Sequence, residues 1–253
     1  MLRNLGIVEV PSKNSSPNGG EHRVAVRRFA GQTLLEWVTR RMTEALLLDH
    51  VAVVADTEHA QQLTNSLPAD LSVFVSDPEH DSVTRLAAAV RHYQPSAVVR
   101  VDLENPFIDP AMIDRLVSRA ESYGCCDYMG YCSTRGGSAL LAQLGVLAEW
   151  CRAEAVLLAD QKATQITERS HLTRFIYSRP DIFQLRLLPV PQPLDRNDLR
   201  LSLKVEEDWE HAQLILDALG PENLDWQRIA HLLDEQPAIR ERMAALNREV
   251  QMV

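Results

Sequence analysis

The sequence predicts an α/β fold in which a mainly parallel sheet is covered by helices on both faces. Through the first 120 residues, short apolar runs typical of strands alternate with stretches whose apolar residues recur at helical spacing. Strands and helices in alternation imply right-handed crossovers between parallel strands. The 253 residues suit one α/β domain, or one large and one small lobe.

The first half of the chain supplies the strands and helices of a doubly wound sheet. Helices are predicted from the apolar spacing of residues 34–46, 83–90 and 112–117, and the last of these has Asp109 as a plausible N-cap and Pro110 at its first position. The predicted strands are residues 5–10, 51–55, 73–75 and 97–101.

The second half is less regular and gives a mixture of elements. Leucines alternate with polar residues over 199–205, which predicts a strand with two different faces. Acidic residues begin the predicted helix 206–219, and Gly220-Pro221 ends it. The other predicted elements are strands at 127–132 and 182–190, one or two helices within 139–159, and surface helices at 226–233 and 239–250.

The composition excludes several classes of protein. The chain has 26 Lys and Arg against 35 Asp and Glu, a net charge of −9, which argues against a nucleic-acid partner. No apolar run is long enough to span a membrane, and the N-terminus does not resemble a signal peptide, so we expect a cytoplasmic protein. The four cysteines form no C-x-x-C pair and are predicted to be buried free thiols. No G-x-G-x-x-G follows a strand, which argues against a dinucleotide oxidoreductase.

Residues 11–23 stand apart as a loop rich in Gly, Pro and polar residues. The loop follows the first predicted strand, and ligands of α/β sheets gather at the carboxyl ends of strands. Its backbone N–H groups, with Lys13 and Arg23, are suited to binding phosphate. A disordered surface loop is the alternative interpretation.

Four segments, in this order along the chain, resemble the cytidylyltransferase family. They are Ala-Gly-Gln-Thr-Leu-Leu-Glu-Trp-Val at 30–38, Asp-Thr at 56–57, Arg-Val-Asp-Leu-Glu-Asn-Pro-Phe-Ile-Asp-Pro at 100–110, and Arg-Leu-Ser-Leu-Lys-Val-Glu-Glu-Asp at 200–208. The resemblance covers roughly residues 5–247. It is to the branch named for spore-coat polysaccharide biosynthesis, which is related to acylneuraminate and Kdo cytidylyltransferases.

This resemblance implies a Rossmann-like α/β/α sandwich of the nucleotide-diphospho-sugar transferase type. The whole chain, 1–253, would be one domain, with a sugar-side extension near 125–195 that often mediates dimerisation and C-terminal helices at 221–253. The family joins a CTP-derived CMP group to an acidic or amino sugar and releases pyrophosphate. Mg²⁺ and basic residues neutralise the phosphate charge in that reaction.

The first departure from the family lies in the loop after the first strand. There the family has Arg-x-Gly-Ser-x-Arg-x-Pro-Gly-Lys, whereas this chain has a longer loop without the first Arg or the Pro-Gly-Lys ending. Lys13, His22 and Arg23 are its cations near the expected triphosphate. Arg23 is an approximate match to the terminal Lys, and it would preserve the charge but not the geometry.

The second departure concerns the metal. The resemblance places Glu104 at the position of a metal-binding Asp, with Asp102 and Leu103 in place of a Thr-Gly pair. Glu104 and Asp102 are therefore candidate Mg²⁺ ligands, although the extra methylene of Glu shifts its carboxylate. Structural roles for both acids are the alternative.

The third departure is at Lys204, which stands where the family has its second metal-binding Asp. An ammonium cannot ligate Mg²⁺ and repels it. We expect Lys204 to face Glu104 in an ion pair that occupies the metal site and impairs the chemistry. The alternative is that Lys204 lies on the solvent face of an edge strand.

The segment Arg169-Ser170-His171-Leu172-Thr173 resembles the family's Arg-Glu-His-Val-Thr, which lies on the sugar side of the family's site. The resemblance makes Arg169, His171 and Asn105 candidate substrate contacts, and a structural role for the histidine is equally compatible with the sequence.

Three functions follow from the sequence. The first is an active transferase acting on a CTP-like nucleotide and a sugar, and the second is a non-catalytic nucleotide or sugar binder or partner subunit. The third is a glycosyltransferase, for which Asp102-Leu103-Glu104 would be a conservative Asp-x-Asp motif. A homodimer is expected if the family's extension is retained.

Overall fold

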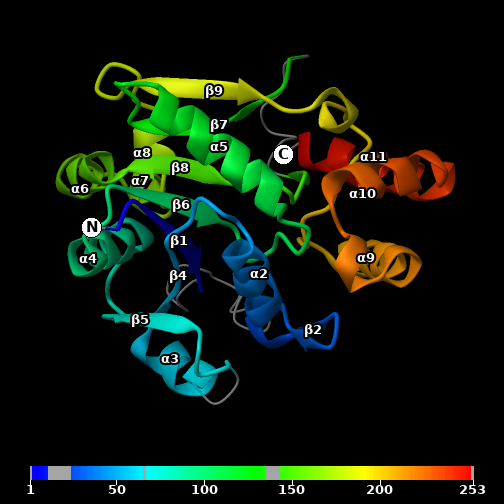
Figure 1. Ribbon diagram of the computed structural model, residues 1–253, viewed down its shortest axis with the longest axis horizontal. Coiled ribbons are helices and arrows are strands. Elements are labelled where there is room, and N and C mark those ends of the chain that lie inside the picture. Colours follow the sequence, from blue (N-terminus) through cyan, green and yellow to red (C-terminus); the bar gives the residue numbers. More distant parts are fainter. Residues whose placement is uncertain (1, 11–23, 65–66, 135–142, 252–253) are drawn as a thin grey trace.

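The computed structural model describes residues 2–10, 24–64, 67–134 and 143–251, and the predicted loop at 11–23 lies outside these residues. Its centre is a seven-stranded sheet with the order β5-β4-β1-β6-β8-β7-β9 (Figure 1). A two-stranded ribbon of β2 (Arg28–Phe29) and β3 (Gln32–Thr33) lies apart from it. The strands of the sheet are β1 (Asn4–Glu9), β4 (His50–Asp56), β5 (Ser72–Ser76), β6 (Ala97–Val101), β7 (Tyr128–Cys132), β8 (Glu149–Arg152) and β9 (Leu185–Pro189).

The sheet is mainly parallel, which confirms the predicted fold class. Strands β5, β4, β1 and β6 all run the same way, and Ile7 at the centre of β1 lies between Ala52 and Arg100. Strand β8 is antiparallel to both β6 and β7, and β9 is again parallel to β7. The first residue of β8 therefore lies at the same edge of the sheet as the last residues of β6 and β7.

Helices cover both faces of the sheet (Figure 1). One buried apolar cluster joins one face to α2 and α5, and a second joins the other face to α4, α6 and α8. The helices are α2 (Leu34–Thr43), α3 (Thr57–Thr64), α4 (Ser82–Tyr93), α5 (Pro110–Ser122), α6 (Ala153–Lys162), α7 (Ile166–Arg169), α8 (Arg174–Tyr177), α9 (Glu206–Leu219), α10 (Trp226–Asp234) and α11 (Pro237–Gln251), with 3-10 turns η2 (Gln192–Leu194) and η3 (Pro221–Asn223).

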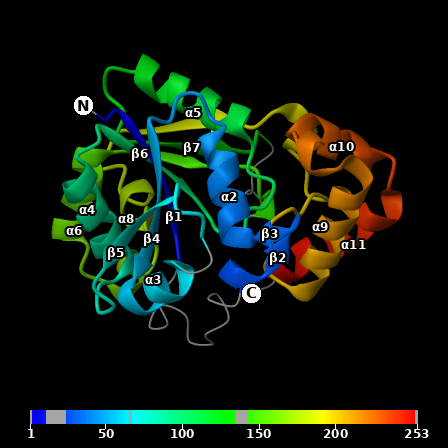
Figure 2. The same ribbon diagram turned by 60° about the horizontal axis from the view of Figure 1, so that its bottom comes forward.

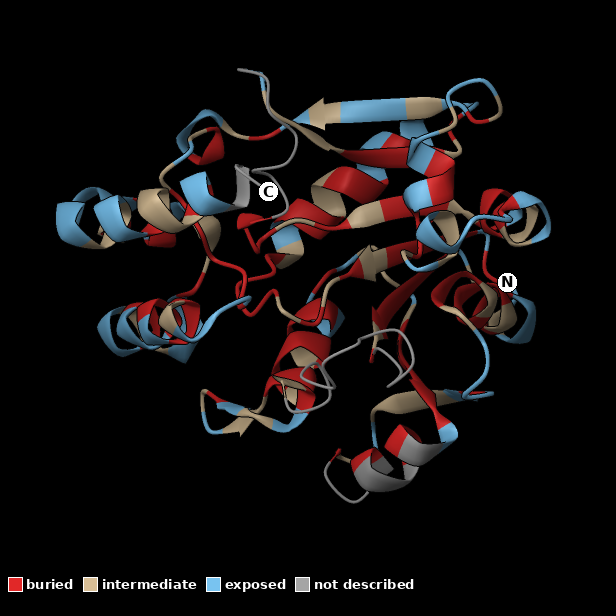
Figure 3. Cartoon of the chain, turned by 180° about the vertical axis from the view of Figure 1, so that it is seen from behind, coloured by how far each residue is buried: buried red, intermediate tan, exposed pale blue. Residues whose placement is uncertain are grey.

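The C-terminal helices α9, α10 and α11 group at one end of the sheet, beside the ribbon β2-β3 (Figure 2). Asp109 connects them to the main body. It caps α5 as predicted, by accepting a hydrogen bond of 2.9 Å from the backbone N–H of Ala111, and its second oxygen accepts one of 2.8 Å from the N–H of Trp226. The outward surfaces of α10 and α11 are largely exposed, as is much of β9 (Figure 3).

The prediction of a strand at 199–205 is wrong. This segment is a connector without strand structure, buried from Leu199 to Leu203, in which the N–H groups of Leu201 and Ser202 bond to the carbonyl of Gln143. Its alternation is real, but through Leu203 both sides of it are buried: the leucines pack in the core, while Arg200 pairs with Asp208. The polar residues Arg200 and Ser202 therefore do not form a solvent face, and the pattern did not mark a strand.

Within the described part of 139–159, the predicted helix is α6, which begins at Ala153. Glu149–Arg152 forms strand β8, in which Trp150 packs in one apolar cluster and Cys151 in the other. All four cysteines are free, but Cys125 is exposed and Cys132 half-buried, which corrects the expectation that all are buried. No helix among the described residues is long and apolar enough to cross a membrane.

Candidate functional site

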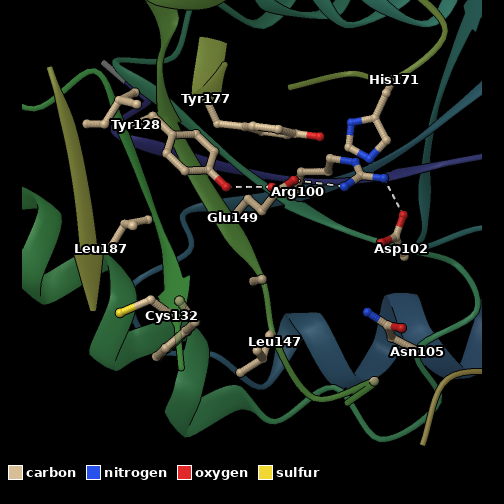
Figure 4. Close-up of a pocket in the computed structure, with 14 residues that line it drawn as sticks. Arg100, Asp102, Asn105, Tyr128, Cys132, Leu147, Glu149, His171, Tyr177 and Leu187 are labelled. Carbon is tan, nitrogen blue, oxygen red and sulfur yellow. Dashed lines mark hydrogen bonds and ion pairs between the residues drawn. The ribbon is translucent and has the colours of Figure 1, made fainter. Parts of the chain in front are cut away.

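A pocket of about 540 Å³ opens at the carboxyl ends of β6 and β7 (Figure 4). The first residue of β8, Glu149, also lines the pocket, because it is paired in register with Arg100 of β6. The pocket is lined by Arg100, Asp102, Asn105, Tyr128, Tyr131, Cys132, Gly145, Leu147, Ala148, Glu149, His171, Tyr177, Leu185 and Leu187.

The polar end of the pocket is organised around Arg100. Its guanidinium donates to Glu149 Oε2 at 2.8 Å and forms a short ion pair with Asp102 (Figure 4). The other partners converge on Glu149, which accepts from the Tyr128 hydroxyl at 2.6 Å and from the Thr173 hydroxyl at 2.8 Å. Glu149 thus ties β6, β7 and the start of α8 together at one carboxylate.

These charges fix the protonation of their neighbours. Burial by itself would raise the pKa of Asp102, but Arg100 and Lys204 outweigh it and lower that pKa. Burial lowers the pKa of His171, and the cation of Arg100 lowers it further, which favours a neutral imidazole. Burial, reinforced by Glu149, raises the pKa of Tyr128 well above its ordinary value.

The segment that follows β6 is held by helix α2. The indole N–H of Trp37 donates to the carbonyl of Pro106 at 2.7 Å, and Arg41 donates to the carbonyl of Ile108 at 2.9 Å. These contacts are buried, and they fix the turn that carries Asp102 and Asn105 into the pocket wall. The resemblance segment 30–38 and the segment 100–110 therefore meet in space.

Of the predicted substrate contacts, His171 and Asn105 line the pocket and Arg169 does not. The Arg169 guanidinium instead donates to Asp81 and Asp160, joining α7 to α4 and α6. The predicted phosphate-loop residues Lys13 and Arg23 lie outside the described residues.

The expected ion pair between Lys204 and Glu104 is present. The two loops that carry it are also joined through their backbones, since the N–H of Leu203 donates to the carbonyl of Glu104 at 2.8 Å. Asp208 holds the other side of the turn by accepting from the N–H groups of Lys204 at 2.8 Å and Val205 at 3.0 Å.

The described residues do not fit a Mg²⁺ site. Magnesium needs carboxylate oxygens in near-octahedral geometry, whereas Glu104 is paired with the Lys204 ammonium and Asp102 with Arg100. Nowhere in the described ranges do three or more His, Cys, Asp or Glu side chains come together as metal ligands would. Each of the two candidate metal ligands is therefore paired with a cation of the protein.

Sequence reasoning missed the residues that organise the pocket: Arg100, Glu149, Tyr128 and Tyr177. Arg100 was visible as the residue two positions before Asp102, at the end of a predicted strand. Glu149 was assigned to a helix, so its place opposite Arg100 had no signal until the antiparallel strand β8 was known.

Comparisons with known proteins identify the family and the fold. The family model described as cytidylyltransferase matches residues 25–211. An uncharacterized protein of Methanocaldococcus jannaschii, MJ1063, is 25% identical over 214 residues, which are 84% of each chain. The spore coat polysaccharide biosynthesis protein SpsF of Bacillus subtilis is 26% identical over 145 residues, 56% of each chain.

Solved structures share the fold at low identity. A cytidylyltransferase from Leptospira borgpetersenii has a TM-score of 0.74 at 18% identity and covers 94% of this chain and 95% of its own. A CMP:2-keto-3-deoxy-manno-octonic acid synthetase complexed with CTP has a TM-score of 0.63 at 11% identity, covering 86% and 100%. Rv0371c of Mycobacterium tuberculosis, in complex with manganese, has a TM-score of 0.57 at 12% identity, covering 83% and 97%.

Proposed function

This chain belongs to the cytidylyltransferase family, and we propose that it binds a CTP-like nucleotide and transfers CMP to a sugar for surface polysaccharide or glycoconjugate biosynthesis. A sugar hydroxyl would attack the α-phosphate, its proton would leave to a base or solvent, and pyrophosphate would be released. The observation that carries the proposal is the polar pocket beside segment 100–110, at the edge of the sheet where α/β proteins bind ligands.

In this proposal the pocket holds the sugar. Asn105 and the neutral imidazole of His171 offer hydrogen bonds to hydroxyl groups, and the Tyr177 ring forms one wall (Figure 4). The triphosphate would lie toward Lys204, with Lys13 and Arg23 of the loop after β1 as further cations. A homodimer formed through the region near 125–195 remains a prediction from the family.

A second candidate is a non-catalytic relative that binds nucleotide or sugar, or acts as a partner subunit. The Lys204–Glu104 ion pair favours it, because one fixed ammonium supplies a single charge where a divalent ion supplies two. The glycosyltransferase alternative has less support, since Asp102 and Glu104 are each paired with a cation.

Calorimetric titration with CTP and UTP, each with and without Mg²⁺, tests the proposal. We expect CTP to bind with an affinity that changes little when Mg²⁺ is added, and Lys204→Asp to make the affinity depend on Mg²⁺. Lys162→Asp, which changes an exposed lysine at the end of α6, is the matched control.

Pyrophosphate release in the presence of CTP and candidate sugars then separates the two candidates. Robust Mg²⁺-dependent synthesis of a CMP-sugar by the unaltered protein would refute the idea that Lys204 replaces the metal. Binding of CTP without any turnover would favour the non-catalytic relative. Failure to bind any nucleotide would overturn both.

A further inference from the structure

The described residues that line the pocket carry a net negative charge. Among the described residues, Arg100 is the cation of the lining, and it is shared between two carboxylates, Asp102 and Glu149. Lys204 and Glu104, which lie next to this group, cancel each other. The described lining residues therefore carry one more carboxylate than cation.

The remaining titratable groups do not reverse this balance. His171 has its pKa lowered, first by burial and then by Arg100, so it is neutral at neutral pH. Arg174, the first residue of α8, acts on His171 and Tyr177 from the exposed surface and is not among the lining residues. Tyr128 keeps its proton, because burial and Glu149 raise its pKa.

Arg100 is not available as a clamp for an acid group. A carboxylate ligand binds arginine best through two parallel hydrogen bonds, and both terminal nitrogens of Arg100 already bond to carboxylates of the protein. A ligand acid would have to displace Asp102 or Glu149 and leave that carboxylate unpaired. Like charges placed together across an interface cost several kcal/mol.

The opposite wall of the pocket is apolar. Leu147 and Leu187 lie there with the half-buried Cys132, away from the cluster around Arg100 (Figure 4). The hydroxyl-binding groups and the carboxylates thus occupy one end, and the other end gives a surface for the carbon skeleton of a ligand.

We infer that this pocket selects a sugar that carries no carboxylate, that is, a neutral or an amino sugar. The inference rests on the proposed function in taking the ligand to be a sugar. Hydroxyl groups can bond to Asn105 and His171, and an ammonium would be attracted by the carboxylates of Asp102 and Glu149. A sugar acid would meet the same carboxylates, and Arg100, the cation among the described lining residues, already bonds to both of them.

The test compares three sugars of one ring type that differ in charge: glucosamine, glucose and glucuronate. Ligand-observed NMR titration of the full chain, at a pH at which glucosamine is protonated, measures their relative affinities. We expect glucosamine to bind at least as tightly as glucose, and glucuronate at least about tenfold more weakly.

Glu149→Gln keeps the size of the side chain and an acceptor oxygen but removes one negative charge, and it should reduce the discrimination against glucuronate. Glu154→Gln, the same change at an exposed position of α6, should leave it unchanged. Thermal melts establish that each variant is folded, and Asp102→Asn replaces Glu149→Gln if that variant is not.

The inference is overturned if glucuronate binds as well as glucose, if none of the three sugars binds, or if neither pocket variant changes the discrimination. The CTP titration reports separately on the proposed function. CTP binding without charge selection would reject this inference alone, whereas charge selection without CTP binding would reject the nucleotide part of the proposed function.

Discussion

A buried ion pair between Arg200 and Asp208 anchors the turn that carries Lys204. Arg200 donates to Asp208 through two bonds of 2.7 and 3.1 Å, and both side chains are buried. Asp208 accepts two further hydrogen bonds, from the N–H groups of Lys204 and Val205 at the start of α9. Removing the aspartate therefore leaves a buried guanidinium unpaired and two backbone donors without their acceptor.

We expect Asp208→Ala to lower the free energy of unfolding by about 5 kcal/mol. Breaking a buried ion pair costs about 3–5 kcal/mol, and losing a helix cap costs about 1 kcal/mol more. Arg200→Met should cost less, about 3 kcal/mol, because Asp208 would keep its two backbone donors.

Urea unfolding followed by tryptophan fluorescence measures both values, since Trp209 lies next to Asp208 in α9. Asp181→Ala breaks an exposed pair with Arg179 and should leave the midpoint unchanged. The reasoning fails if Asp208→Ala costs less than about 1 kcal/mol, or if Arg200→Met is the more damaging of the two.

Two further predictions concern stability. Burial, aided by the cation of Arg242, lowers the pKa of His211 in the folded state, so the unfolded chain takes up a proton first as the pH falls. Stability should therefore decline as the pH drops below about 6.5, and His211→Leu should reduce that decline in unfolding measured across this range. Gly145 has φ +63°, and a Cβ there would lie 2.4 Å from the backbone of the 199–205 connector. Gly145→Ala should cost at least about 2 kcal/mol in thermal or urea unfolding, whereas Gly124→Ala, with open space around it, should be nearly neutral.

The sequence predicted those parts of the fold in which local pattern and tertiary role agree. Valine-rich runs form the central parallel strands β4 and β6. Asp109 is the N-cap of α5, as the Asp-Pro sequence at 109–110 predicted. The pattern misled at 199–205, because an ion pair with Asp208 satisfies Arg200 in the interior. A polar residue in an alternating run marks solvent only when it has no buried partner.

Of the contacts in the candidate site, the sequence predicted only the ion pair between Lys204 and Glu104. Lys204 and Glu104 could be paired because two motifs of known order place them at the ends of neighbouring segments. The pocket itself depends on which strand follows β6 in the sheet, and no local pattern encodes that neighbour. Arg169 illustrates the converse, since its motif matched the family while its guanidinium joins three helices of this chain.

Because the N–H of Leu203 donates a hydrogen bond to the carbonyl of Glu104, the conformation of this turn does not depend on the charge of the side chain at position 204. Because that bond and the carboxylate of Asp208 hold the turn through main-chain atoms, the side chain at 204 can change sign while the loop keeps its course. If the proposed function holds, a single exchange at 204 would convert a cation supplied by the protein into a ligand for an external cation. Dependence on a divalent ion would then change without rebuilding the scaffold.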